Sequence, residues 1–370
     1  MAAATAAAVD TGTDAAIVQV DIGGGEPIEL PDFRPALPLR SGHVQTAMMP
    51  LAGGRPFRER GDARRLIVEY RDGTGDSTDA YHCPGEGDAA GRPVLVLFHG
   101  LGGTADSNYV TRTAADVRDG GFDVITPNFR GAGTSGPLAR QLHHPGRKED
   151  VKAFLRQLVE QYPEFDGREL VVAGFSLGGH VVLKYLADEH ETDGPVVAGL
   201  TISAPLSLDA TSRQLSKAGN LAFCAYILKK MKKEYGRENA DVTEAERKLI
   251  AAARTVWQFD DTFTSPRLGF EGAAAFYEEM SAVDELERVD VPTVMVHAED
   301  DPFVPHGHYE DAVFNRAECL SRVLVPHGGH IAFFETLGGR RWLDETIVTL
   351  LRSRFWCGAS DCGDDDPSQT

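Results

Sequence analysis

A serine between two glycines is the residue of this sequence best suited to chemistry. The stretch LVVAGFSLGGHVV, from Leu170 to Val182, places Ser176 between Gly174 and Gly178. The glycines permit a strained turn that lifts the hydroxyl away from the backbone, where it can attack an acyl carbon. The pattern alone is weak evidence, because 39 of 370 residues are glycine and a purely structural turn has the same composition.

The residues around this motif predict a strand, a sharp turn and a helix. Residues 170–173 form a short apolar run, which is typical of a buried parallel strand. Apolar residues recur at helical spacing over 181–186. This context favours a nucleophilic serine over a structural turn.

A nucleophilic serine requires an imidazole to take its proton and a carboxylate to orient that imidazole. After a turn of this type the expected chain order is serine, acid, histidine. His330 follows the apolar run 321–325 and a pair of glycines, and it is the first candidate for the base. His327 is the second candidate, and His306 and His308 are expected at the surface.

Three acidic residues compete for the second role at the end of the run TVMVHAEDD. Asp301 is the first candidate because Pro302 follows it and biases it to an extended backbone. Asp300 is the second candidate and Glu299 the third. A solvated acidic turn is the structural alternative.

Two backbone N–H groups are needed to stabilise the negative charge that develops on the acyl oxygen. Leu177, directly after the serine, supplies one, and Leu101 in the loop HGLGG supplies the other. His99 is expected to order that loop. The loop is not predicted to bind phosphate or a dinucleotide, because the lysine of a P-loop and a G-x-G-x-x-G pattern are both missing.

Alternating apolar runs and amphipathic stretches predict the elements that position these groups. Strands are expected within 64–73, 77–83, 92–100, 122–131, 170–173, 194–205, 291–301 and 321–325. Helices are expected within 107–121, 148–163 and 340–355, and after Ser176. This alternation predicts an α/β fold with a doubly wound, mostly parallel sheet.

One interval departs from this alternation of strands and helices. Residues 205–289 contain only helical and loop patterns, and an insertion there would lie over the carboxyl ends of the strands as a lid. The predicted organisation is a disordered tail over 1–25, a core over 26–204 and 290–357 around the lid, and an acidic tail over 358–370.

Residues within the insertion and near the start suggest further roles. Phe223 and Phe276 are candidates for the lining of an acyl pocket. Asp260 and Asp261 are expected to be helix caps or hinges. The lysines of 229–233 lie on a helix with a predicted core face and a solvated face, and contact with anionic lipid is the less favoured alternative.

His43 and Gln45, within the segment SGHVQT near the start of the chain, are expected to anchor that segment by hydrogen bonds.

Composition narrows the classes of partner and location. A net charge of −19 argues against nucleic acid as a binding partner, because its phosphate backbone would be repelled. No apolar run reaches 18 residues, and the first 25 residues lack lysine and arginine, so we expect a cytoplasmic protein rather than a secreted or membrane-spanning one. Five scattered cysteines fit reduced thiols. No cofactor or metal is expected, and a metal clip at Cys357 and Cys362 is disfavoured.

Seven motifs resemble the YheT-like branch of the α/β-hydrolase superfamily, which includes medium-chain ester synthase/esterases. They are SGHVQT (41–46), HGLGG (99–103), NFRGAGTSG (128–136), GFSLGGHVVLKYL (174–186), FDDTFTSPRLGF (259–270), AEDDPF (298–303) and GGHIAFFE (328–335). The resemblance implies an α/β-hydrolase fold and a triad of Ser176, Asp301 and His330. His180 departs from the asparagine usual in this branch, which puts substrate specificity in doubt.

These observations predict a serine hydrolase of the carboxylesterase type that cleaves acyl esters of short to medium chain through an acyl-enzyme. An acyltransferase to an alcohol and a lipid hydrolase with the same triad are the alternatives. A non-catalytic binding protein of this fold is the third, less favoured because such a protein has no need for all three side chains. The expected partner is a small-molecule or lipid-like ester.

Overall fold

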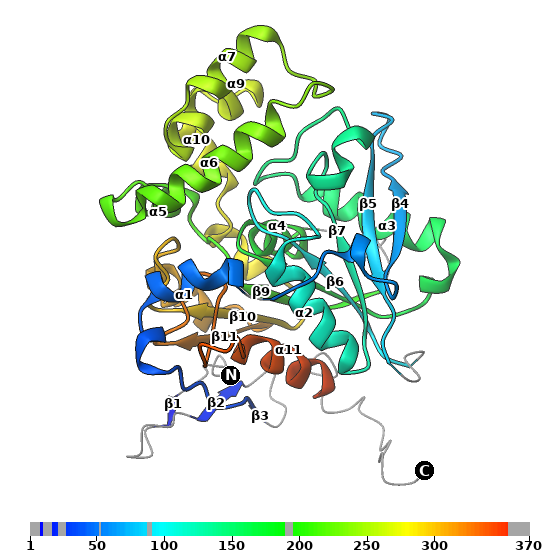
Figure 1. Cartoon of the computed structure of the whole chain (residues 1–370), viewed down its shortest axis with the longest axis vertical. Coiled ribbons are helices and arrows are strands. Elements are labelled where there is room, and N and C mark those ends of the chain that lie inside the picture. Colours follow the sequence, from blue (N-terminus) through cyan, green and yellow to red (C-terminus); the bar gives the residue numbers. More distant parts are fainter. Residues whose placement is uncertain are drawn as a thin grey trace.

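The computed structural model describes residues 8–9, 17–20, 27–51, 53–86, 91–188 and 195–353. Its centre is an eight-stranded sheet in the order β11-β10-β9-β8-β6-β7-β5-β4 (Figure 1). The strands are β4 (Arg64–Glu69), β5 (Ser77–Cys83), β6 (Val94–Phe98), β7 (Asp123–Pro127), β8 (Leu170–Phe175), β9 (Val196–Ile202), β10 (Thr293–Ala298) and β11 (Leu320–Val325). The pairs from β7 through β6 to β11 are parallel, whereas β5 pairs antiparallel with both β4 and β7. The predicted strands and the mostly parallel sheet are confirmed.

Helices cover both faces of the sheet. Those of the core are α1 (Gly42–Met48), α2 (Asn108–Asp119), α3 (Lys148–Gln161), α4 (Leu177–Leu186) and α11 (Trp342–Arg352). Apolar residues of α3 and α4 pack on one face, and those of α2 and α11 pack on the other. The fold is therefore doubly wound, as predicted.

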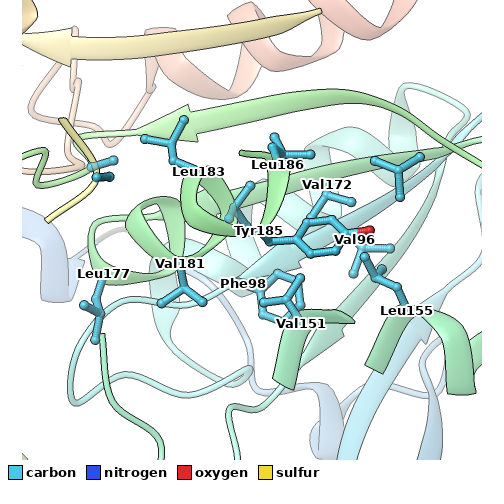
Figure 2. Packing of buried hydrophobic residues seen from close by; sticks show 14 of the residues in the cluster. Val96, Phe98, Val151, Leu155, Val172, Leu177, Val181, Leu183, Tyr185 and Leu186 are labelled. Carbon is cyan, nitrogen blue, oxygen red and sulfur yellow. The ribbon is translucent and has the colours of Figure 1, made fainter. Parts of the chain in front are cut away.

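The strands at the centre are apolar along their whole length because both of their faces are covered. In β6, Val96 and Phe98 belong to the cluster under α3 and α4, while Leu95 and Leu97 belong to the opposite cluster. Figure 2 shows the first cluster, in which side chains of α4 lie close to Val96, Phe98 and Val172 of the sheet. Each such side chain contributes about 1.5–3 kcal/mol when it is removed from water, so this packing fixes the turn before α4 in place.

The chain between β9 and β10 is helical and lies beyond the carboxyl edge of the sheet (Figure 1). It contains α5 (Leu208–Leu215), α6 (Leu221–Tyr235), α7 (Glu244–Ala252), α8 (Val256–Phe259), the π-helical turn η7 (Asp260–Thr264), α9 (Ser265–Arg267), α10 (Ala273–Met280) and the 3-10 helix η8 (Val283–Arg288). Two apolar clusters within these helices hold them to one another. We call this segment, residues 205–289, the insertion.

The lysine-bearing helix α6 has the predicted core face and solvated face. Cys224, Leu228, Met231 and Tyr235 are buried at spacings of three and four residues. Leu221 and Tyr226 do not belong to that face, because 54% and 60% of their surfaces are exposed.

A small antiparallel sheet lies at the start of the chain. It consists of β1 (Ala8–Val9), β2 (Ile17–Val20) and β3 (Ile28–Glu29). β1 and β2 lie within residues 1–25, the predicted disordered tail, for which no strand was expected. The other residues of that range lie outside the described residues, as do the acidic tail, Cys357 and Cys362. Within the described ranges, no helix has the length and apolarity needed to cross a membrane, and no cluster of side chains fit to hold a metal ion is found.

Candidate active site

Ser176 lies in the tight turn between β8 and α4. Its backbone has φ 51° and ψ −121°, a conformation that residues other than glycine rarely adopt. A Cβ on Gly174 would lie 2.3 Å from the carbonyl carbon of Gly178, and a Cβ on Gly178 would lie 2.5 Å from the carbonyl oxygen of His99. Only glycine fits at these two positions, so they permit the strained turn that the sequence predicted.

His330 connects Ser176 to Asp301. Its Nε2 lies 2.9 Å from Oγ of Ser176, and its Nδ1 lies 2.8 Å from Oδ2 of Asp301. The three residues follow β8, β10 and β11, whose carboxyl ends meet at one edge of the sheet. The structure thus brings together all three of the first-choice residues, with both distances in the range of a hydrogen bond.

The Asp301 carboxylate is fully enclosed and well supported. Its Oδ1 accepts hydrogen bonds from the N–H groups of Phe303 and Val304, at 2.7 and 3.0 Å. Burial alone would raise the pKa of this carboxyl group, but the charge and hydrogen bond of His330 outweigh burial and hold the pKa below its usual value. Asp301 is therefore ionised at neutral pH and can stabilise a positive charge on His330.

The second candidates for the acid and the base, Asp300 and His327, pair with each other beside the hydrogen-bonded residues Ser176, His330 and Asp301. Oδ2 of Asp300 lies 3.5 Å from Nδ1 of His327, and Oδ1 of Asp300 accepts a hydrogen bond from the N–H of Gly329 at 2.9 Å. Nδ1 of His306 lies 3.0 Å from the carbonyl oxygen of Glu299, and Nδ1 of His308 lies 3.0 Å from Oδ2 of Asp311; both contacts are at the surface, as expected for these two histidines. The geometry therefore favours Asp301 and His330.

Helix α1 supports the loop that carries His330. The Thr46 hydroxyl accepts a hydrogen bond from the His330 N–H at 2.9 Å and donates one to Gly42 O at 2.7 Å. Gln45 is fully buried and bridges Leu39 O to the backbone of Phe334. The predicted anchoring role of Gln45 is confirmed. Thr46 was missed, although it stands in the same motif, SGHVQT.

The glycine of that motif, Gly42, has no room for a side chain. A Cβ there would lie 1.8 Å from the carbonyl oxygen of Asp300. His43 is exposed and its Nε2 lies 3.1 Å from Oδ1 of Asn220 in the insertion. Asn220 also donates to Pro302 O, next to Asp301. The predicted anchoring role of His43 is thus confirmed, and its partner is the insertion.

The N–H groups of Leu101 and Leu177 remain free for a ligand. Both residues line the cavity that contains Ser176, and among the hydrogen bonds of the described residues none uses either N–H as a donor. His99 orders the loop before Leu101, because its Nδ1 bonds to Gly100 O and its Nε2 accepts from the Phe129 N–H. The predicted role of His99 is confirmed.

Ser176 and His330 open on a cavity of about 640 Å³ between the core and the insertion. Its walls are mainly apolar and include Met49, Leu208, Leu215, Phe223, Ile227, Val256 and Phe303. The Phe223 ring packs against Phe303, and Phe303 in turn packs against His330, with ring centroids 5.1 and 4.7 Å apart. The cavity has the size and character of a site for a small apolar ligand.

One of the predictions about the insertion requires correction. Phe276 does not line the cavity, because it is fully buried between α5 and α10 with Leu208 and Tyr277. Asp261 accepts a hydrogen bond from the N–H of Ala273, the first residue of α10, and so acts as the expected cap. Asp260 is the C-cap residue of α8, where its backbone N–H donates to Val256 O, while its carboxylate is buried in the cavity wall.

His180, which stands where the YheT-like branch usually has asparagine, lies behind the active site rather than in it. His180 is fully buried in the first turns of α4, and its Nδ1 lies 2.7 Å from the carbonyl oxygen of Pro205. Pro205 begins the insertion and lines the cavity. The His180 side chain therefore positions the cavity wall, and His180 meets Ser176 only through its backbone N–H, which donates to Ser176 O at 3.0 Å.

Buried histidines make the stability of this fold sensitive to acid. Desolvation lowers the pKa of three of them to about 4 and that of a fourth to about 3; they are His99, His180, His297 and His144, respectively. In the unfolded chain each pKa is close to 6.5, so below that pH the unfolded state binds more protons than the folded state. Burial raises the pKa of Asp260 and Asp344 to about 6, and these two groups act in the opposite direction.

We therefore expect the free energy of unfolding to be highest above pH 7 and to fall as the pH decreases from 6.5 to 4. Urea unfolding at pH 7.5, 6 and 5 measures this loss. The variant His180→Asn should lose about 2 kcal/mol less than the wild type between pH 7.5 and 5, because one proton-binding group is removed. An unfolding free energy that stays constant over this range would contradict the prediction.

Comparisons with known proteins agree with this geometry. The sequence model of the family described as alpha/beta hydrolase fold matches residues 93–337. The Escherichia coli protein named "Putative esterase YheT" is 30% identical over 329 residues, which cover 86% of this chain and 93% of that protein. Medium-chain fatty acid ethyl ester synthase/esterase 2 of Saccharomyces cerevisiae is 26% identical over 69% of this chain and 61% of its own length.

A solved structure shares the fold. An esterase of Pyrococcus furiosus superposes with a TM-score of 0.52 and 15% sequence identity, over 80% of this chain and 93% of that one. Because its identity is low, this match shows the fold alone. The family match and the identity to the bacterial relative show more: the chain belongs to the α/β-hydrolase family, in its YheT-like branch.

Proposed function

We propose that this protein is a serine carboxylesterase that cleaves acyl esters of short to medium chain. The observation that carries the proposal is the hydrogen-bonded series from Ser176 through His330 to Asp301 at the wall of an apolar cavity. The names of relatives as esterases and lipases support the reaction class.

In the proposed reaction, Oγ of Ser176 attacks the ester carbonyl carbon while its proton passes to Nε2 of His330. The carbonyl oxygen becomes negatively charged and accepts hydrogen bonds from the N–H groups of Leu101 and Leu177. The tetrahedral intermediate then collapses, and the His330 proton goes to the departing alkoxide, which leaves as an alcohol. An acyl group remains on Ser176.

Water completes the proposed cycle. It loses a proton to Nε2 of His330 as it attacks the acyl-enzyme, and the second tetrahedral intermediate releases the carboxylic acid while the proton returns to Oγ of Ser176. Throughout, the Asp301 carboxylate accepts the hydrogen bond from Nδ1–H of His330, so Nε2 always faces the serine.

The apolar wall predicts a dependence on acyl length. Each CH₂ transferred from water to the cavity contributes about 0.8 kcal/mol, which is about fourfold in kcat/KM. We expect activity on p-nitrophenyl esters to rise with acyl length to an optimum and then fall. The variant Phe223→Ala should move this optimum to longer chains, because it removes a ring from the wall beside Phe303.

The series from acetate to dodecanoate, measured as kcat/KM for both proteins, tests the prediction. Leu249→Ala is the matched control, because Leu249 is 42% exposed on α7 and does not line the cavity. A wild-type profile that is flat with acyl length would contradict an acyl-binding cavity.

A further inference from the structure

The loop after β6 carries Leu101, whose N–H is one of the two proposed donors to the acyl oxygen. We call residues 100–104 the oxyanion loop. A hydrogen bond from Gly103 N–H to Gly100 O, at 3.0 Å, closes this loop into a turn. The N–H of Gly100 donates to the hydroxyl oxygen of Tyr109, at 2.9 Å. A side chain from the first turn of α2 therefore holds the beginning of the oxyanion loop.

The Tyr109 hydroxyl fills the hollow that two glycines leave in this turn. A Cβ on Gly103 would lie 2.5 Å from the phenol oxygen, and a Cβ on Gly100 would lie 3.5 Å from it. The absence of a side chain at Gly103 is what lets the oxygen approach the backbone so closely. The oxyanion loop and the Tyr109 hydroxyl are thus complementary in shape.

The ring of Tyr109 connects the oxyanion loop to the strand of the nucleophile. It packs edge-on against Phe175, with ring centroids 5.0 Å apart and an interplanar angle of 78°. Phe175 is fully buried at the end of β8 and directly precedes Ser176. A Cβ on Gly100 would lie 3.1 Å from Cβ of Ser176, so the loop and the serine are close neighbours. Tyr109 therefore contacts both parts of the site, and it lines the same cavity as Ser176.

Gly100 takes part in two peptide groups, and each is held separately. The N–H of the first peptide donates to Tyr109, while the carbonyl of the second accepts from Gly103 N–H and lies 2.9 Å from Nδ1 of His99. The second peptide is trans and planar, so the Leu101 N–H points opposite to that carbonyl. Because glycine rotates freely about both of its backbone bonds, the direction of the Leu101 N–H is fixed only when both peptides are held.

We propose that Tyr109 is a positioning residue for the reaction of Ser176: by holding the Gly100 N–H, its phenol oxygen aims the Leu101 N–H at the acyl oxygen of the transition state. The inference rests on the proposed esterase function and adds to it a residue outside the series Ser176, His330 and Asp301. A well-placed donor contributes on the order of 10²–10³-fold to kcat, because it meets charge that develops only after the substrate has bound. Loss of the phenol oxygen should therefore slow the chemical step and leave substrate binding unchanged.

The variant Tyr109→Phe tests this role with the smallest change. It keeps the ring against Phe175 and removes the acceptor of the Gly100 N–H. We expect kcat on p-nitrophenyl butanoate to fall about 30-fold, while KM changes less than about twofold. The inhibition constant of an alkyl trifluoromethyl ketone, which forms a tetrahedral oxyanion with the serine, should rise by a similar factor. A protein that is merely destabilised would contain less active enzyme, but its inhibition constant would not change.

Two further variants accompany it. Tyr235→Phe is the matched control, because the Tyr235 hydroxyl is also buried and donates to a backbone carbonyl, that of His143 at 2.6 Å, but does not line the cavity. It should leave kcat, KM and the inhibition constant within about twofold of the wild type. Ser107→Ala loosens the Tyr109 hydroxyl without removing it, because the Ser107 side chain hydrogen-bonds to that hydroxyl and also accepts the Thr104 N–H at 2.9 Å. We expect it to lower kcat about fivefold with KM unchanged.

Urea unfolding verifies that each variant is folded, and the possible failures are distinguishable. If folded Tyr109→Phe keeps kcat and the inhibition constant within about twofold of the wild type, or if its loss lies in KM, the positioning role is wrong and the esterase function stands. Should Tyr109→Phe not fold, an unchanged kcat and inhibition constant in Ser107→Ala would overturn the role in the same way. If wild-type protein cleaves no ester, both proposals are overturned.

Discussion

Replacement of Ser176 by alanine is expected to lower ester hydrolysis on the order of 10⁶-fold in kcat and to abolish labelling by a fluorophosphonate probe. The reason is that no other hydroxyl lies within hydrogen-bond distance of Nε2 of His330 in the described structure. Folding should be preserved. The hydroxyl makes one hydrogen bond, to His330, and the backbone bonds of residue 176 to Ile202 and His180 do not depend on the side chain.

A second serine provides a matched control. Ser203 is buried at the end of the neighbouring strand β9 and also has a positive φ, of 50°. Its hydroxyl accepts a hydrogen bond from the N–H of Ile331 instead of contacting the His330 ring. Ser203→Ala should therefore keep probe labelling and most of the hydrolytic activity. Labelling of Ser176→Ala at the wild-type level would remove Ser176 from the role of nucleophile.

The sheet was predictable because its central strands can be recognised from their local sequence alone. Strands such as β6 and β8 are buried on both faces, so they appear in the sequence as unbroken apolar runs between turn residues. The order in which serine, acid and histidine follow such strands is a property of the chain itself. For these reasons the three strand ends that carry Ser176, Asp301 and His330 were found without any structure.

Neighbouring residues of the same type were harder to separate. Asp300 and Asp301 are both acidic and follow the same strand, and their roles differ only because one side chain faces His330 and the other faces Gly329 and His327. Asp260 and Asp261 differ in the same way, since one faces the cavity and the other faces the start of α10. Side-chain direction in a loop or a π-helical turn follows from tertiary packing rather than from a period in the sequence.

The partners of long-range support were not predictable from the sequence. Thr46 holds the backbone of His330 across 284 positions of sequence, and Phe276 packs inside the insertion rather than in the cavity because of the way α5 and α10 meet. A helix places its residues at fixed angular intervals, but the partner that each face meets is set by the fold. The motif SGHVQT marked the segment as important without indicating which of its residues contacts the site.

Replacement of Asp301 by asparagine is expected to lower kcat/KM about 10⁴-fold, whereas replacement of Asp300 by asparagine should lower it less than about threefold. In the Asp301→Asn variant, the side-chain amide oxygen can still accept from Phe303 and Val304, as the carboxylate does. The amide nitrogen then faces Nδ1 of His330, which must act as the acceptor. The imidazole proton moves to Nε2, where it points at Ser176 and prevents His330 from taking the serine proton.

The comparison is sharp because the two changes are chemically identical and adjacent. In the Asp300→Asn variant, the amide oxygen can keep the hydrogen bond from Gly329, and only a 3.5 Å contact with His327 loses its charge. Both variants are assayed on p-nitrophenyl butanoate, with urea unfolding to verify that each remains folded. A severe loss for Asp300→Asn together with a mild one for Asp301→Asn would mean that His330 is oriented from the other side of the loop. In that case the pair Asp300 and His327 would have to be part of the catalytic machinery, and the proton path proposed through Asp301 would be wrong.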